Sequence, residues 1–314
     1  MKLSRRDFLQ TAALTVASAS VISHVRTTSA VPATAFITGR PKKAILGALP
    51  DAARIEKLRA LGIEGMEITG APSIQEAEKM RKVAESMDFR FHSIMGGGSV
   101  ERMELASALG ADAVLVVPGR VSGVKMPEPW EFKIHFDEKT NRLLEVVEGD
   151  NTPYADYIKA HNAEMERARK HVESLIPTAE KLGIVIGLEN VWNNMWVHPH
   201  FAANFVLSFD SPWVQAYFDI GNNVKYYPRP QDWFDSFQGK VIRVHIKDFK
   251  LNENGRGGRF ARIMEGSVDW LAVRKKMEEV GFDRWMTVEL EGCPLTDEEQ
   301  AHRLELIASG KPLV

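Results

Sequence analysis

The sequence lacks the features that mark disulfide-rich, nucleic-acid-binding and dinucleotide-binding proteins. Its 314 residues include one cysteine, Cys293, so no disulfide can form within the chain and cysteine usage indicates no redox compartment. The 40 basic and 42 acidic residues give a formal net charge of −2, which provides no basic field to attract nucleic acid. No Gly-x-Gly-x-x-Gly string follows the first predicted strand, which argues against a dinucleotide-binding domain. The composition, 44% hydrophobic and 26% charged, is typical of a globular domain with a substantial core.

The N-terminal segment has the features of an export signal. Arg5 and Arg6 precede a short apolar run at 11–22 that contains no acidic residue. This layout is typical of a twin-arginine signal, which the export machinery reads as an address. The run is too short and too rich in Ala, Ser and Thr for a stable membrane span. We therefore expect residues 1–35 to be a cleaved or disordered twin-arginine signal, residues 36–314 to form the functional domain, and the periplasm to be the destination.

Beyond residue 35, short apolar and β-branched runs alternate with longer helical patterns. This alternation is typical of repeated βα units around a parallel sheet. Eight such units fit a closed barrel better than an open doubly wound sheet, so we predict an α/β fold, a single-domain (β/α)₈ TIM barrel. The predicted strands cover residues 44–49, 65–70, 89–95, 113–117, 184–191, 214–221, 241–249 and 285–292.

Two insertions interrupt this rhythm, after the fourth and the seventh predicted strands. The first covers residues 119–153, and its alternating runs at 130–136 and 143–147 predict a β-hairpin. A long helix is expected to follow, from about residue 153 to residue 182. The second insertion, residues 250–266, contains four glycines and three arginines and is predicted to be a loop.

Four consecutive predicted strands each carry a metal-capable residue near their ends: Glu189, Asp219, His245 and Glu289. The working face of a closed barrel lies at the C-terminal ends of its strands, so we expect these side chains to converge there. Each residue alone could be a helix cap, an ion-pair partner or a core residue, but three carboxylates at one point repel one another unless a cation lies among them. Three carboxylates with one imidazole suit Mn²⁺, Mg²⁺, Co²⁺ or Zn²⁺, and the absence of thiolates argues against a purely structural zinc site. The sequence thus predicts one divalent metal ion.

The strings around these four residues resemble the strand-end motifs of the xylose-isomerase-like barrel superfamily, a group of sugar isomerases and epimerases. They read Gly-Leu-Glu-Asn at 187–190, Phe-Asp-Ile-Gly-Asn at 218–222, Val-His-Ile-Lys-Asp at 244–248 and Val-Glu-Leu-Glu-Gly at 288–292. The resemblance covers essentially all of the chain after the signal and implies the same four metal ligands. Glu291 lies on the same face of its predicted strand as Glu289, but the first glutamate of that string resembles the family's ligand.

The resemblance also implies a mechanism. In epimerases of this superfamily the metal chelates a carbonyl oxygen and a neighbouring hydroxyl, which stabilises an enediolate. One metal-bound glutamate removes a proton and the other returns one on the opposite face of the carbon. These catalytic roles fall to Glu189 and Glu289, while Asp219 and His245 would hold the ion.

Other residues near the predicted strand ends are candidates for substrate binding. His92 and Glu67, which end the third and second predicted strands, could hydrogen-bond a sugar hydroxyl or carbonyl. Lys247 could neutralise an anionic substrate or orient a carboxylate such as Asp248. Trp192 and Trp130 offer apolar faces for sugar C–H groups.

Two further features bear on the substrate class. Asn222 stands where free-ketose epimerases of the superfamily often have a histidine, which weakens the transfer of their specificity. The loop after the seventh strand is basic and glycine-rich, which suits an anion. It contains Arg256, and Glu265 belongs to a string that partly matches the Gly-Glu-Gly-like string of phosphosugar epimerases. Because sugar phosphates are scarce outside the cytoplasm, export instead favours a non-phosphorylated ketose or keto-glycoside.

The leading interpretation is therefore a divalent-metal-dependent sugar isomerase or epimerase, with a homodimer as a family-level expectation. A lyase or dehydratase acting on an inosose or a 3-keto-glycoside would share the first proton abstraction. A non-catalytic exported sugar-binding protein is a third possibility. The related DNA-repair endonucleases are disfavoured, because the extra histidines for their further zinc ions are missing and the near-neutral charge does not suit DNA.

Overall fold

The computed structural model describes residues 39–313. The predicted twin-arginine signal at 1–35 lies outside the described residues. None of the helices within residues 39–313 is long and apolar enough to cross a membrane.

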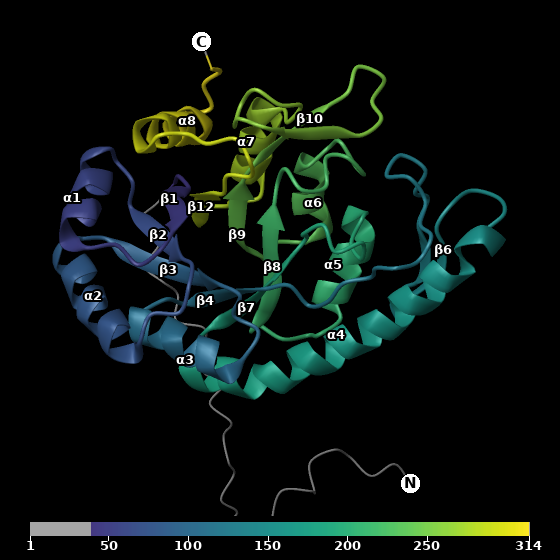
Figure 1. Cartoon of the computed structure of the whole chain (residues 1–314), viewed down its shortest axis with the longest axis horizontal. Helices are drawn as coiled ribbons and strands as arrows, with labels where there is room; N and C mark the ends of the chain where they lie inside the picture. The colour runs from purple at the N-terminus through teal and green to yellow at the C-terminus, as the bar shows by residue number, and fades with distance from the viewer. Residues whose placement is uncertain (1–38, 314) are drawn as a thin grey trace, which may run out of the picture. The chain divides into compact units, whose positions relative to one another are not determined.

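Eight parallel strands form a closed barrel at the centre of the described chain, which confirms the predicted fold (Figure 1). Their order around the barrel is β1-β12-β9-β8-β7-β4-β3-β2, so each strand neighbours the barrel strands before and after it in the sequence. The strands are short and apolar because they are covered on both faces. Their bounds are Lys42–Gly47 (β1), Gly65–Ile68 (β2), Arg90–Met95 (β3), Ala113–Val116 (β4), Val185–Glu189 (β7), Val214–Asp219 (β8), Val241–Ile246 (β9) and Trp285–Val288 (β12).

Among residues 39–313, seven α-helices connect these strands, an eighth follows β12, and together they surround the barrel (Figure 1). Local sequence sets several of their starts: Asp51 accepts a hydrogen bond from the backbone N–H of Arg54, and Ser73 and Thr296 each form a capping box with the glutamate three residues later. The helices cover Ala52–Ala60 (α1), Ile74–Ser86 (α2), Val100–Leu109 (α3), Ala155–Leu182 (α4), Pro199–Leu207 (α5), Gln231–Ser236 (α6), Trp270–Glu279 (α7) and Asp297–Ser309 (α8).

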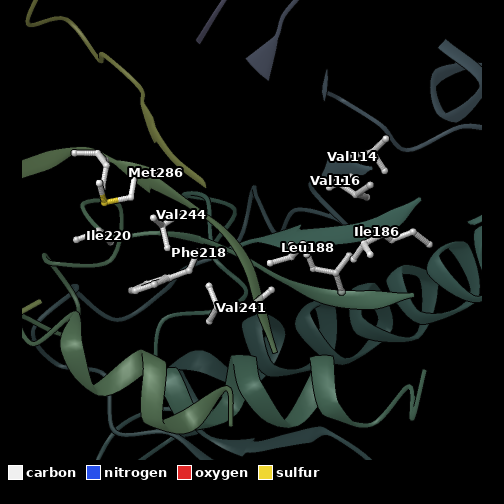
Figure 2. Packing of buried hydrophobic residues seen from close by; sticks show 14 of the residues in the cluster. Val114, Val116, Ile186, Leu188, Phe218, Ile220, Val241, Val244 and Met286 are labelled. Atoms are coloured by element: carbon white, nitrogen blue, oxygen red, sulfur yellow. The ribbon is translucent and has the colours of Figure 1, made fainter. Parts of the chain in front are cut away.

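The hydrophobic core lies between the barrel and its helices. Figure 2 shows part of it, with Phe218, Val244 and Met286 among the packed side chains. Phe218 of β8 stacks on Trp233 of α6, with ring centroids 5.4 Å apart. Because side chains alternate along a strand, outward packing of Phe218 directs its neighbours Tyr217 and Asp219 into the barrel.

The first insertion forms a shorter hairpin than predicted. Its strands are β5 (His135–Asp137) and β6 (Arg142–Glu145), so the predicted strand at 130–136 is wrong over most of its length. Asp137 accepts hydrogen bonds from the backbone and hydroxyl of Thr140, which starts the turn at Asp137. The side chain of Asn162 in α4 exchanges two hydrogen bonds with the backbone of Leu143, which ties the hairpin to that helix.

The second insertion is an ordered hairpin and not a loop. The predicted strand at 241–249 divides after Ile246, and β10 (Asp248–Leu251) pairs antiparallel with β11 (Gly258–Ala261). Asp248 anchors the base of the hairpin, since its carboxylate accepts hydrogen bonds from the backbone N–H groups of Met264 and Gly266 and from the Trp270 indole. The charged and glycine-rich composition of this insertion is typical of a loop. The hairpin depends instead on pairing between β10 and β11, two segments that meet only when the chain reverses its direction.

Candidate metal centre

Four predicted ligands meet at the C-terminal end of the barrel. Glu189 ends β7, Asp219 ends β8, His245 is the penultimate residue of β9 and Glu289 directly follows β12. One ligand atom from each of the four lies within 4.8 Å of every other. The Nδ1 atom of His245 is 3.3 Å from Glu189 Oε1, 2.9 Å from Glu289 Oε2 and 3.9 Å from Asp219 Oδ2. The four adjacent strands therefore produce one compact cluster of oxygen and nitrogen donors.

Hydrogen bonds fix the Asp219 carboxylate with one oxygen turned toward the cluster. Asn190 exchanges two hydrogen bonds with the Asp219 backbone. The backbone N–H groups of Gly221 and Asn222 donate to Oδ1 of Asp219 at 2.8 and 2.7 Å. Its Oδ2 is buried and accepts no hydrogen bond from residues 39–313. A buried carboxylate oxygen without a hydrogen bond needs a nearby cation. Lys247 Nζ lies 3.2 Å from Oδ2, and the remaining lone pairs of this oxygen also fit a metal ligand.

A fourth carboxylate, that of Glu67, lies behind the cluster. It is fully buried, and its Oε2 is 2.7 Å from His245 Nε2 and accepts a hydrogen bond from the Tyr217 hydroxyl at 2.6 Å. Ser93 lies 3.1 Å from the same hydroxyl. When Nε2 of His245 carries the proton and donates to Glu67, Nδ1 keeps its lone pair for a metal. Glu67 is thus placed to orient His245, and it is not among the residues that line the neighbouring cavity.

Lys247 supplies a positive charge inside the cluster. Its Nζ is 3.2 Å from Asp219 Oδ2 and 2.8 Å from Glu289 Oε2. It also donates to the side-chain oxygen of Asn222 at 3.3 Å and lies 5.3 Å from the centre of the Phe260 ring. The predicted nearness of Lys247 and Asn222 to the metal ligands is therefore present in the structure.

The pKa values of these groups reflect two opposing effects. Burial disfavours the charged form of each group, and neighbouring groups of opposite charge favour it. Burial raises the pKa of Glu189, and it raises the pKa of Asp219 to about 7 although Lys247 favours its ionised form. For Glu289, burial is outweighed by His245 and Lys247, which hold its pKa below the usual value. Burial likewise opposes the charge of His245, but Glu289, Glu67 and other neighbours together outweigh it and raise the pKa of His245. Each carboxylate of the cluster lies close to His245 or Lys247. The donor set of three carboxylates and one imidazole can hold a divalent ion.

The cluster opens into a cavity of about 510 Å³ at the same end of the barrel. Glu189, Glu289, Lys247, Asn222 and Trp192 all line it, so three predicted substrate-binding residues do face this space. The Trp192 indole donates a hydrogen bond to the backbone oxygen of Asn222.

One cavity-lining residue, Phe260 of β11, was not predicted. Its ring stacks on Trp192 with centroids 4.6 Å apart. No sequence signal placed Phe260 at the site, because its position depends on the unpredicted hairpin. Tyr217 was also missed, although its spacing of two residues from Asp219 puts it on the same strand face.

His92 does not lie at the end of its strand, contrary to the prediction. It is the third residue of β3, at a bulge where Phe91 and Ser93 pair with successive residues of β2. Its ring is buried, lies 3.0 Å from the Thr287 hydroxyl and stacks on Trp285. Together with Trp285, His92 lines a separate cavity toward the N-terminal ends of the strands. It is therefore not placed to touch a ligand at the metal centre.

The remaining candidates for substrate binding also lie away from the cavity. Arg256, at the tip of the β10–β11 hairpin, lies 5.8 Å from the centre of the Trp130 ring, and neither residue is among those lining the cavity. Glu265 accepts a hydrogen bond from Arg303 of α8 at 2.6 Å. Both charged residues thus have partners within the fold, and a role for them in substrate binding stays a prediction.

Comparisons with known proteins place the chain among barrels of this kind. A family model described as "Xylose isomerase-like TIM barrel" matches residues 55–308. An uncharacterised protein of Methanocaldococcus jannaschii is 28% identical over 124 residues, which cover 38% of this chain and 41% of that protein. The chain thus aligns with less than half of this relative.

Several solved structures share the fold. The 3-keto-D-glucoside 4-epimerase of E. coli has a TM-score of 0.62 at 13% identity, with 86% of this chain and 100% of that chain covered. The mannonate dehydratase of Streptococcus suis has a TM-score of 0.59 at 13% identity, with coverage of 88% and 98%. A xylose isomerase-like TIM barrel protein of Mycobacterium smegmatis, solved in complex with magnesium, has a TM-score of 0.56 at 18% identity, with coverage of 86% and 96%.

At these identities the solved structures establish the fold alone, and they include both an epimerase and a dehydratase. The family model, by contrast, spans most of the sequence. The chain belongs to the xylose isomerase-like TIM barrel family.

Proposed function

We propose that this protein is a divalent-metal-dependent isomerase or epimerase of a keto-sugar. The observation that carries the proposal is the placement of two glutamates. In the barrel order, β8 and β9 separate β7 from β12, so Glu189 and Glu289 approach the cavity from opposite sides of Asp219 and His245. Both glutamates line the same cavity, where a bound sugar would lie between them.

This arrangement suits proton transfer at a single carbon. A divalent ion bound by Glu189, Asp219, His245 and Glu289 would polarise the substrate carbonyl and acidify the adjacent C–H bond. One glutamate then accepts the proton from one face of the carbon, and the other donates a proton to the opposite face. Asp219 is held by backbone N–H groups and His245 by Glu67, so these two residues are suited to holding the ion while the glutamates exchange protons.

A lyase or dehydratase is the second candidate, because it would begin with the same proton abstraction. The observation that favours it is Lys247, the only cation among the cavity-lining residues, which lies 2.8 Å from Glu289. An ammonium group at this position could donate a proton to a departing oxygen. Product mass separates the two reactions, because isomerisation conserves the mass of the substrate and elimination does not.

The test is incubation with Mn²⁺ in heavy water and a panel of ketoses, sugar phosphates and keto-glycosides, followed by mass spectrometry and stereochemical assignment. We expect deuterium incorporation next to the carbonyl of at least one compound, without loss of mass. Glu189→Gln and Glu289→Gln should each abolish the exchange, whereas Glu104→Gln, on the exposed surface of α3, should retain it. Metal-dependent exchange would also exclude a purely sugar-binding role. Exchange that persists in both glutamate variants would refute the proposed roles.

A further inference from the structure

We infer that the cavity binds a neutral keto-sugar that carries an apolar substituent, and not a phosphorylated sugar. This inference rests on the proposed function, because it assigns a substrate class to the same site. It depends on two independent properties of the cavity walls, their charge and their apolar character.

The charge of the cavity disfavours phosphate. Three carboxylates line it, those of Glu189, Glu289 and Glu291, against the single ammonium group of Lys247. That ammonium already lies within 3.2 Å of Asp219 and 2.8 Å of Glu289. A phosphate dianion entering the cavity would therefore meet excess negative charge. With the neighbouring Asp219 carboxylate included, four carboxylates stand against one ammonium group, so a divalent ion at the ligand cluster would reduce the imbalance from −3 to −1 without reversing it.

The nearby arginines do not relieve this imbalance. Arg256 lies over the Trp130 ring, and Arg262 donates to Glu299 of α8. Arg102, next to the cavity in sequence, donates to the backbone oxygens of Met95 and Gly70 at 2.6 and 2.5 Å. None of the three arginines lines the cavity. These three arginines are thus committed to contacts within the fold. Lys225, whose Nζ lies 3.4 Å from the centre of the Trp192 ring, is also not among the residues that line the cavity.

The opposite wall of the cavity is apolar. Met95 of β3 and the alternate residues Leu115 and Val117 at the end of β4 line it, while the side chain of Val116 packs in the core. In the closed barrel β4 lies opposite β12 and β3 lies opposite β9, so this wall faces the side that carries His245 and Glu289. Val117 is 41% exposed, which leaves apolar surface open to a ligand. A free ketose has hydroxyl groups along its whole length and would leave this surface unmatched, whereas an apolar aglycone would cover it.

The prediction can be tested by calorimetry with inert probes, so that binding is measured without turnover. The probes are methyl β-D-glucopyranoside, phenyl β-D-glucopyranoside and D-glucose 6-phosphate, each added to the Mn²⁺-loaded protein. Burial of the phenyl ring against the apolar wall should make the phenyl glucoside bind about tenfold more tightly than the methyl glucoside. Glucose 6-phosphate should bind more weakly than either.

Substitution of the wall provides a matched pair of variants. Val117→Ser should bring the ratio of phenyl to methyl affinity close to one, whereas Val100→Ser, at an equally exposed valine on α3 outside the cavity, should leave the ratio unchanged. Equal binding of the two glucosides by the wild-type protein, failure of the phenyl glucoside to bind, or preference for glucose 6-phosphate would overturn the inference. Phenyl preference without proton exchange on the ketose panel would instead count against the proposed reaction alone, and exchange without phenyl preference would count against the substrate class alone.

Discussion

Replacing Glu67 by glutamine tests how His245 is held for metal binding. Oε2 of Glu67 is 2.7 Å from His245 Nε2 and 2.6 Å from the Tyr217 hydroxyl, whereas Oε1 is buried and has no hydrogen-bond partner among residues 39–313. A glutamine can keep both hydrogen bonds through its oxygen while its NH₂ group takes the place of Oε1. The substitution therefore removes the charge that makes His245 a stronger base, with little change in shape.

Loss of a carboxylate behind a metal-binding histidine typically costs about 10–100-fold in metal affinity, or about 1.4–2.7 kcal/mol. We expect Glu67→Gln to weaken Mn²⁺ binding by that factor and to lower the free energy of unfolding of the metal-free protein by less than Glu67→Leu does. Glu67→Leu differs, because it leaves the Nε2–H of His245 buried without an acceptor, whereas the Tyr217 hydroxyl can still donate to Ser93. At about 1–3 kcal/mol for a lost partner, Glu67→Leu should destabilise the metal-free protein by about that amount.

The assays are chelator-competition titration with Mn²⁺ and urea unfolding of the metal-free protein. Glu104→Gln, the same change on an exposed helix, is the control and should match the wild-type protein in both assays. If Glu67→Gln binds Mn²⁺ as tightly as the wild type does, Glu67 does not act through His245. If Glu67→Gln and Glu67→Leu lower stability equally, the structural hydrogen bonds and not the charge explain the role of Glu67.

Three further predictions concern the metal ligands and one buried histidine. Mn²⁺ at about 100 times its dissociation constant should stabilise the wild-type protein by about 2.7 kcal/mol in thermal unfolding, and Asp219→Asn should lose most of this gain. Glu289→Gln should weaken Mn²⁺ binding by about tenfold or more, whereas a loss of similar size in Glu291→Gln would mean that the wrong glutamate of this string has been assigned as the ligand. Burial lowers the pKa of His161 to about 4. The unfolded chain therefore binds a proton at this residue near pH 6.5, whereas the folded protein does not. The free energy of unfolding should be unaffected by His161 above pH 6.5 and should fall by about 3 kcal/mol as the pH drops toward 4. Urea unfolding across this range should show a shallower loss in His161→Gln, and an unchanged slope would contradict the assignment.

The clustering of the four candidate ligands could be predicted from the sequence because two simple regularities locate them. Parallel strands end at one face of a barrel, and side chains alternate along each strand. Glu189 and Asp219 end strands whose apolar character is plain in the sequence, and Glu289 follows such a strand directly. The convergence of their side chains then needs no knowledge of the helices or the insertions.

The surroundings of the ligands could not be predicted in the same way. A bulge at His92 shifts the alternation of inward and outward side chains along β3. A single extra residue of this kind leaves no clear mark in the sequence. Arg256 and Glu265 look available in the sequence, but Trp130 and Arg303 contact them from distant segments. Contacts between residues far apart in the chain decide which polar side chains reach the cavity.

The interior of this barrel is polar over much of its length, whereas barrels of this architecture are mostly filled by branched apolar side chains. Arg243, His245 and Lys247 succeed one another along and just beyond β9, and all three are buried. Arg243 donates to His92 and to Asp112, and His245 pairs with Glu67. Buried charges of this kind are weak contributors to stability, so the packing between the strands and the surrounding helices must supply most of it (Figure 2). This separation of a polar barrel interior from an apolar outer core has a functional consequence. It leaves the inside of the barrel free to hold a cation at one end, with hydrogen-bonded side chains behind it.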